Sequence, residues 1–95
     1  MLLSEPLDEF LNYALAIELE QEGQLTEAIR VIREILERNE NYGGGYYKLG
    51  ELLAKEGQKA EAIAIYHKGI AIAQKQRNAK ATRELRAALE NLEDE

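Results

Sequence analysis

The chain has no cysteine, and this absence excludes disulfide bonds and thiolate metal sites. Glycine and proline are also scarce, because seven glycines and one proline are too few for a β-rich chain built on tight turns. No apolar run reaches the length of a signal peptide or of a membrane span. We therefore expect a cytoplasmic protein that does not contact a membrane.

The chain lacks an excess of basic residues. Its net charge is −6, so the phosphate backbone of a nucleic acid would be repelled, and we expect no nucleic-acid partner. Residues 1–42 carry ten acids and three bases, whereas residues 43–76 carry three acids and five bases. This asymmetry has two interpretations: the charges lie on solvated helix faces, or the acidic first part meets the basic second part of a neighbouring molecule.

A set of converging catalytic groups is also missing. His67 is the only histidine, and no cysteine or second histidine could join it in a metal or catalytic site, so we expect an exposed side chain. The run Gly43-Gly44-Gly45 lacks the preceding strand and the following Lys-Ser/Thr of a phosphate-binding loop. We predict no enzyme activity, no cofactor, and no catalytic or metal-binding residues.

What the sequence does contain is an internal repeat of 34 residues. Compared with itself at this offset, the chain shows nine identities that cluster in three places. Tyr13, Leu15 and Leu19 match Tyr47, Leu49 and Leu53; Glu22-Gly23-Gln24 matches Glu56-Gly57-Gln58; and Glu27-Ala28-Ile29 matches Glu61-Ala62-Ile63. Such clustering is hard to obtain by chance and predicts two copies of one structural unit.

Each unit is predicted to form two helices, because apolar residues recur at i, i+3, i+4 and i+7. Gly23 and Gly57 can end the first helix of each unit by taking the left-handed conformation. The predicted helices are 5–21 with Ser4 as N-cap, 25–38, 45–56, 59–76, and 79–92 with Asn78 as N-cap. The last helix has one apolar stripe and one polar face, as the end of a stacked array requires.

The three glycines between the units leave two interpretations open. Gly43 to Gly45 form either a loop with a frayed first helical turn, or a functional feature such as a hinge or a close approach of two backbones.

The second unit combines a Leu-Gly pair with small and aromatic residues at fixed spacing. The pattern consists of Tyr46, Leu49-Gly50, Leu53, the turn residue Gly57, Ala62, Tyr66 and Gly69. It resembles the tetratricopeptide repeat family, and in particular its small, bacterial-type two-repeat members. The first unit departs from the pattern, since Asn12 replaces the aromatic residue and Ala16 the glycine. Neither unit has the usual closing proline.

The resemblance implies an all-α fold with two helical hairpins and a C-terminal capping helix in a right-handed α–α superhelix. Repeat one would span residues 9–42, repeat two residues 43–76 and the capping helix residues 78–92, in a single domain of residues 1–95.

The resemblance also implies that the first helices of the units line a concave groove that holds a peptide or protein segment. The residues predicted to bind the partner there are Phe10, Tyr13, Ile17, Tyr47, Lys48, Glu51, Lys55 and Arg83. Tyr13 and Tyr47 either contact the partner or pack as half-buried core. One subset of the family grips a C-terminal carboxylate, but of the corresponding positions only Lys80 fits, so we do not expect that activity.

Three functions remain open at this point. The leading prediction is a protein–protein interaction module without catalysis. The alternative is a self-associating structural subunit, a homodimer, to which Leu2, Leu3, Leu7 and the charge asymmetry would contribute. A helical subunit that supports a catalytic partner is the third, and nothing in the sequence tests it.

Overall fold

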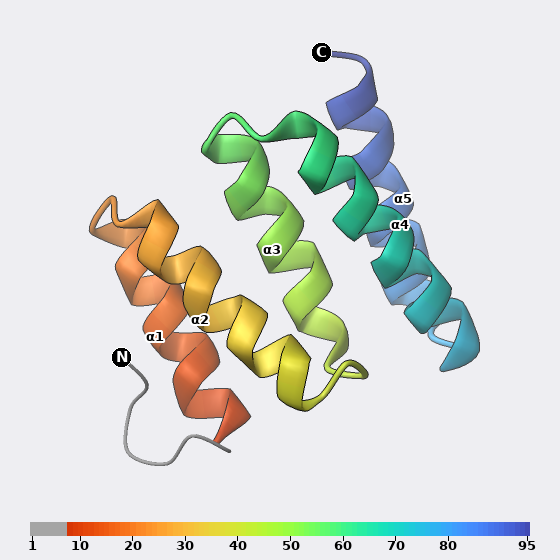
Figure 1. Cartoon of the computed structure of the whole chain (residues 1–95). Coiled ribbons are helices and arrows are strands. Elements are labelled where there is room, and N and C mark those ends of the chain that lie inside the picture. The colour runs from red at the N-terminus through yellow and green to blue at the C-terminus, as the bar shows by residue number, and fades with distance from the viewer. Residues whose placement is uncertain (1–7) are drawn as a thin grey trace.

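The computed structural model describes residues 8–95, and these residues form five α-helices joined by short turns (Figure 1). The helices are α1 (Glu9–Gln21), α2 (Leu25–Arg38), α3 (Gly43–Lys55), α4 (Lys59–Lys75) and α5 (Ala79–Glu93). No strand occurs between Asp8 and Glu95. The prediction of an all-α repeat fold is therefore confirmed.

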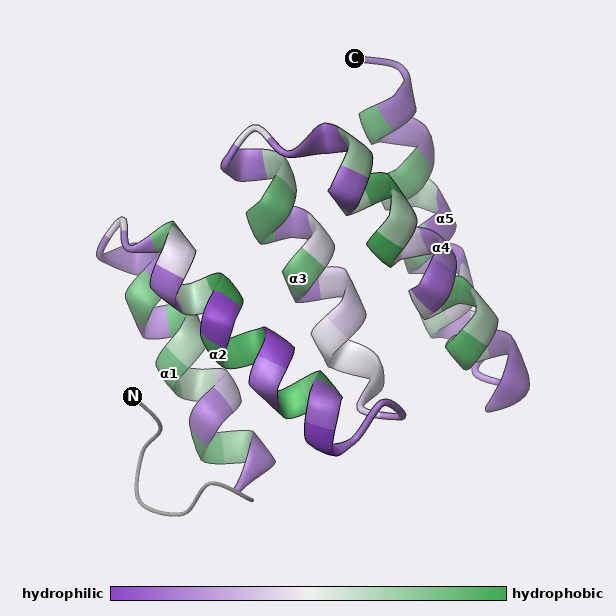
Figure 2. Cartoon of the chain, viewed as in Figure 1, coloured by the Kyte–Doolittle hydropathy of each residue, from purple (hydrophilic) through white to green (hydrophobic). Residues whose placement is uncertain are grey.

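The helices form a row in which each packs against the next, and α3 also contacts α5. In Figure 1, α2 lies in front of α1 and α4 lies in front of α5, so that the second helix of each hairpin belongs to the nearer layer. Green and purple segments alternate along the helices in Figure 2, as expected where each helix buries only one side.

The two hairpins repeat with the predicted period. The helices α1 and α3 both contain 13 residues, and they start 34 positions apart, at Glu9 and Gly43. The same offset separates Leu25 from Lys59, the first residues of α2 and α4. Helix α5 starts at Ala79, 36 positions after Gly43, so the third helical unit is shifted by two residues.

The turns that follow α1, α3 and α4 share one backbone geometry. In each, an amide donates to a carbonyl five residues earlier: Gln24 to Leu19, Gln58 to Leu53 and Asn78 to Ala73, all at 2.9 Å. The left-handed position of this motif is Gly23 in the first turn (φ 81°) and Gly57 in the second (φ 89°), which confirms the predicted helix ends. In the third turn the same position is Arg77, with φ 57°.

The start of the first helix differs from the prediction. Asp8 is extended, and its carboxylate accepts a hydrogen bond from the Leu11 amide at 3.0 Å, so Asp8 is the N-cap and α1 begins at Glu9. The predicted cap, Ser4, lies outside the described residues. Asn78 caps α5 as predicted, because its side chain accepts from the Ala81 amide at 3.0 Å.

The interpretation of Gly43 to Gly45 as a loop is wrong. All three residues belong to α3, which begins two residues earlier than predicted. Gly45 is buried, and a Cβ atom there would lie 2.8 Å from Leu36 Cδ2, so this glycine packs closely against a side chain of α2. The ends of α4 and α5, at Lys75 and Glu93, differ from the predicted ends by one residue each.

The core lies between the helices and depends on two close contacts at glycine. Gly50 faces the ring of Tyr66, which would overlap a Cβ atom at that position. Gly69 faces Tyr46, whose Cβ would lie 2.6 Å from the added atom. Helices α3 and α4 can therefore approach closely on both sides, and Leu49, Leu52 and Leu53 are almost fully buried beside them.

Within residues 8–95, no helix has the length and apolar character needed to cross a bilayer.

Candidate functional site

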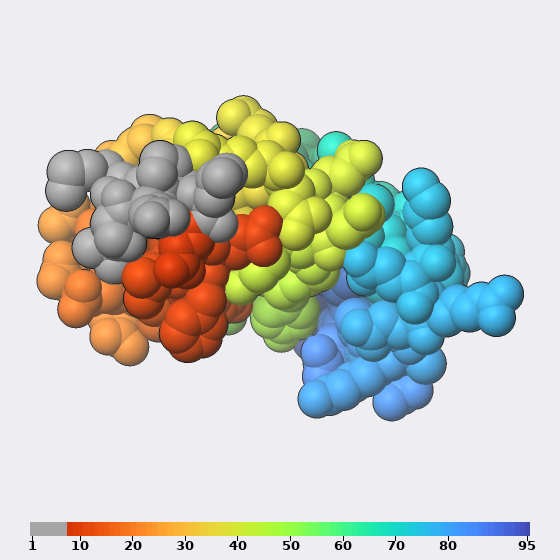
Figure 3. Space-filling view, turned by 90° about the horizontal axis from the view of Figure 1, so that it is seen from below, coloured from red at the N-terminus to blue at the C-terminus, as the bar shows by residue number. Residues whose placement is uncertain are grey.

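The helices α1, α3 and α5 lie on one side of the molecule, which we call the first-helix face. In the end-on view of Figure 3, α1 (red) and α5 (blue) both reach the lower edge, with α3 (green) between them. Seven of the eight predicted partner-binding residues lie on α1 and α3, and Arg83 lies on α5. This arrangement brings equivalent positions of the repeat onto one surface.

Charged side chains of α1 and α3 form one connected network on this face. The Glu20 carboxylate accepts hydrogen bonds from the ammonium groups of Lys48, at 2.9 Å, and Lys55. Lys48 also donates to Glu51 at 2.6 Å. Glu20 belongs to the first repeat and Lys48 to the second, so the network connects the two repeats. Their side chains are only 11% and 15% exposed.

The network shifts the pKa values of Glu20 and Lys48. The hydrogen bond from Lys55, and next that from Lys48, lowers the pKa of Glu20. Burial acts to lower the pKa of Lys48, but the hydrogen bonds to Glu51 and Glu20 outweigh it and raise that pKa to about 12. The Glu20 carboxylate and the Lys48 ammonium group therefore stay charged at neutral pH, and a partner would meet lysines that already have acidic neighbours.

The two tyrosines at equivalent positions each pack one side of the ring against a second tyrosine. Tyr13 lies against Tyr42, with 5.8 Å between ring centroids, and Tyr47 lies against Tyr66, with 6.3 Å. Tyr13 is half-buried, and Tyr47 remains 40% exposed. Burial raises the pKa of Tyr13 and that of Tyr66, the latter to about 12, so both hydroxyls stay protonated. Each ring of the predicted pair thus has features of both alternatives, since it is partly packed and partly available.

The remaining predicted residues lie around this centre. Ile17 is half-buried on α1, whereas Phe10 is 74% exposed near the start of the same helix. Arg83 lies apart from the network, in a cleft of about 370 Å³ at the α4–α5 turn that Arg77 and Arg86 also line. The structure brings four of the predicted residues together around Glu20: Lys48, Lys55 and Glu51 through ion pairs, and Tyr13 through its electrostatic interaction with Glu20, Lys48 and Glu51. Phe10 and Arg83 lie outside this cluster.

Sequence reasoning missed the part that Tyr42 plays in this surface. Tyr42 is the N-cap residue of α3, and the equivalent residue in the first repeat is Asp8, so the comparison of the two units contained no signal for a ring there. The pairing of Glu20 was also not anticipated, because its partners lie 28 and 35 residues away.

Between Asp8 and Glu95, no three histidine, cysteine, aspartate or glutamate side chains converge in a way that could hold a metal ion. His67 is exposed on α4, as predicted.

Solved structures that superpose on this chain include tetratricopeptide repeat domain proteins. The solution structure of a tetratricopeptide repeat domain protein from Salinibacter ruber is 32% identical and superposes with a TM-score of 0.89, over 96% of this chain and 92% of that one. A crystal structure of the Salinibacter ruber protein gives a TM-score of 0.84 at 32% identity, over 92% of this chain and 97% of that one. A Bordetella parapertussis protein at 24% identity has the same fold, with a TM-score of 0.83 over 92% of this chain and 76% of that one.

A search of the curated proteins finds no match. The family model described as tetratricopeptide repeat matches residues 19–89, which include the second helix of the first hairpin, the whole second hairpin and most of α5. Members of this family are typically non-catalytic modules that mediate protein–protein interaction. Together with the solved structures, this match shows that the chain belongs to the tetratricopeptide repeat family.

Proposed function

We propose that the chain is a protein-binding module that holds a peptide or protein segment against its first-helix face and catalyses no reaction. The observation that carries this proposal is the partly exposed ring of Tyr47, which is held in place by Tyr66 and lies next to Lys48 in the sequence. A fixed aromatic ring offers contact area at a low entropic cost, and its hydroxyl offers a hydrogen bond.

The network of Glu20, Lys48, Glu51 and Lys55 supports the same proposal. Because the two carboxylates and two ammonium groups are paired with one another, the network presents organised hydrogen-bonding groups whose charges balance. Such a surface favours a segment that binds through backbone hydrogen bonds and uncharged side chains, because a highly charged segment would have to break the existing ion pairs. Residues 1–95 would act as a single domain with the repeat limits predicted above.

The experiment is an affinity pull-down from the source cell with the wild-type chain and with Tyr47→Ala. The expected result is loss of the captured partner from the variant, with a binding constant weakened about tenfold or more, as is common for a tyrosine at the centre of an interface. His67→Ala, an exposed change on α4, is the matched control and should retain the partner. Thermal unfolding of both variants shows whether the fold is retained.

Retention of the same partners by Tyr47→Ala and by the double variant Tyr13→Ala/Tyr47→Ala would reject the first-helix face as the binding site. A large loss of stability with unchanged binding would assign the two rings to the core alone.

Self-association is the second candidate, and it is favoured by exposed apolar side chains on α1. Phe10 is 74% exposed and Leu11 is 37% exposed, which is unusual for large hydrophobic residues at adjacent positions. Leu2, Leu3 and Leu7, which entered the sequence-based argument for a homodimer, lie outside the described residues. Light scattering coupled to size-exclusion chromatography decides the matter: a dimer that Phe10→Ser/Leu11→Ser converts to a monomer would support it, and a monomer across the micromolar range would reject it.

A further inference from the structure

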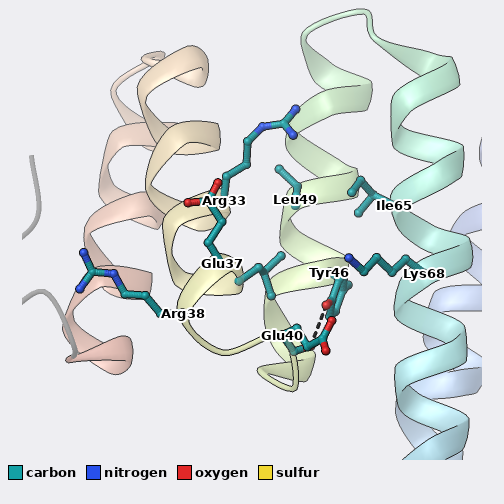
Figure 4. A pocket seen from close by; sticks show the side chains of 9 residues that line it. Arg33, Glu37, Arg38, Glu40, Tyr46, Leu49, Ile65 and Lys68 are labelled. Carbon is teal, nitrogen blue, oxygen red and sulfur yellow. Dashed lines mark hydrogen bonds between the residues drawn. The ribbon is translucent and has the colours of Figure 1, made fainter.

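A cleft of about 500 Å³ lies between α2 and α4, with α3 as its floor (Figure 4). It faces away from the first-helix face, because α2 and α4 form the opposite layer of the hairpins. Its volume falls within the range of about 300–1,000 Å³ that is usual for ligand-binding sites. Apolar side chains from all three helices line it: Leu36, Leu49 and Ile65.

The walls of this cleft are held in place by polar contacts. Arg33 on α2 forms an ion pair with Glu61 on α4 across the space between the two helices. Beyond the end of α4, the Gln76 side chain donates to the Asn41 carbonyl at 2.8 Å and ties α4 to the α2–α3 turn. The cleft therefore lies between two cross-links and is present before any partner arrives, which reduces the entropic cost of binding.

The floor is fixed as well. Tyr46 is 2% exposed, and its hydroxyl donates to the Glu40 carbonyl at 2.6 Å, so its only polar group already has a partner. Leu49 is also 2% exposed, whereas Leu36 and Ile65 are only half-buried. The apolar surface that a partner could cover is therefore that of Leu36 and Ile65, on the two facing walls.

The two walls differ in charge. Lys68 on α4 extends its ammonium group toward the cleft above Tyr46, whereas Arg38 and the Glu37 carboxylate on α2 point away from the floor (Figure 4). Arg33 is neutralised by Glu61. Among residues 8–95, Lys68 has no carboxylate within ion-pair distance, so it is a cation next to apolar surface without an acidic partner.

Glu40 limits where a negative charge can be placed. It lines the α2–α3 end of the cleft, and a second carboxylate beside it would be repelled. A carboxylate is favoured only on the α4 side, at Lys68. An occupant that matches this cleft thus combines an apolar group between Leu36 and Ile65 with one carboxylate directed toward α4.

We propose that the α2–α4 cleft is a second docking site, which takes an apolar side chain of a protein segment together with an aspartate or glutamate adjacent to it. A protein segment fits better than a free small molecule, because the cleft is open to solvent and would leave much of a small ligand uncovered. The site is independent of the first-helix face, and its two cross-links share no residue with the network around Glu20.

The test is an NMR titration of the ¹⁵N-labelled full chain with the capped peptide Asp-Leu-Leu-Asp and, in parallel, with the capped peptide Lys-Leu-Leu-Lys. The expected result is a saturable shift of the amides of Leu36, Tyr46 and Ile65 with the acidic peptide and a weaker effect of the basic one. Lys68→Glu should weaken binding of the acidic peptide about tenfold and reverse the preference between the two peptides.

Two control variants separate the explanations. Lys59→Glu makes the same charge change at an exposed position of α4 outside the cleft, and it should leave the preference for the acidic peptide unchanged. Tyr47→Ala, which tests the first-helix face, should leave this titration unaffected, so failure of one proposal does not count as failure of the other.

The proposal would be overturned by any of three results: absence of saturable binding at millimolar peptide, shifts confined to α1 and α5, or equal binding by wild type and Lys68→Glu. Shifts of the cleft amides on dilution of the protein alone would assign the cleft to a second copy of the chain and would overturn it as well.

Discussion

Glycine-to-alanine substitution should have opposite effects on stability at two positions of α3. Gly44 is exposed, and the nearest side-chain atom to an added Cβ would be a ring carbon of Tyr42 at 3.9 Å, an ordinary contact. Alanine loses less backbone freedom than glycine when a helix forms, which favours Gly44→Ala by about 0.5–1 kcal/mol. For a domain of this size, we expect the melting temperature to rise by about 2–6 °C.

Gly50 has the same helical backbone but a different neighbour. A Cβ there would lie 2.7 Å from Tyr66 Cζ and 2.8 Å from Cδ1, and the ring is 4% exposed and has little room to move. Overpacking of this kind costs about 1–3 kcal/mol and exceeds the backbone gain of about 0.5–1 kcal/mol. We therefore expect Gly50→Ala to be destabilised by about 0.5–2 kcal/mol, and Gly50→Leu by more.

Both variants can be compared with wild type by urea unfolding followed by circular dichroism, with the free energy of unfolding as the readout. A neutral or stabilised Gly50→Ala would refute the close contact between α3 and the Tyr66 ring. A destabilised Gly44→Ala would show that the run of glycines needs its backbone freedom, and would support the hinge between the repeats that was one interpretation of the sequence.

Two further predictions concern the third turn and the charged network. Arg77→Gly should stabilise the chain by about 0.5–1 kcal/mol, because it removes an arginine from a left-handed position that is glycine in the other two turns. Gly57→Ala should destabilise the chain by a similar amount, and equal melting temperatures for the wild type and both variants would reject this reasoning. Glu20→Gln should lower the melting temperature at pH 7, and the difference from wild type should shrink as the pH falls below 4.5. The pKa of Glu20 is lower in the folded chain than in the unfolded chain, so the carboxylate stabilises the fold above the unfolded-state pKa, and this stabilisation is lost when the carboxylate is protonated. A difference in melting temperature that stays constant down to pH 2 would contradict the network.

The sequence was sufficient to predict the fold because the same information recurs at several levels. Identity at an offset of 34 residues, apolar spacing along the helices and glycine at Gly23 and Gly57 all indicate the same hairpin, and the structure has helices at that offset. The boundaries of α2, at Leu25 and Arg38, agree with the prediction. The shift of two residues in α5 also shows in the sequence, because an offset of 36 residues aligns Leu85 and Leu89 with Leu49 and Leu53. All four leucines are buried in the structure.

Where prediction was wrong, a tertiary contact or a polar cap had more effect than the intrinsic propensity of the residue. Gly43 to Gly45 are poor helix formers, yet they are helical, and Gly45 packs so closely against Leu36 that a Cβ atom there would force this side chain to move. At the N-terminal end, Ser4 was predicted to cap the first helix, but Asp8 caps α1 through its hydrogen bond from the Leu11 amide. Propensity alone could not rank these candidates.

The proposed binding surface was harder to infer because its chemistry depends on ion pairs between the two repeats. The pairing of Lys48 and Lys55 with Glu20 could not be inferred from the sequence, because Glu20 lies 28 and 35 residues before them and only the arrangement of the two hairpins brings its carboxylate to both ammonium groups. Lys68, by contrast, lies on the opposite layer, and no carboxylate of residues 8–95 lies within ion-pair distance of it. The family resemblance assigned the lysines of α3 to partner recognition, whereas in the structure Lys48 and Lys55 are paired with carboxylates and Lys68, in the α2–α4 cleft, is not. If an unpaired cation next to apolar surface decides where an acidic segment binds, then Lys68→Glu should weaken binding of such a segment more than Lys55→Glu does. Titration of both variants with the acidic peptide tests this reasoning directly.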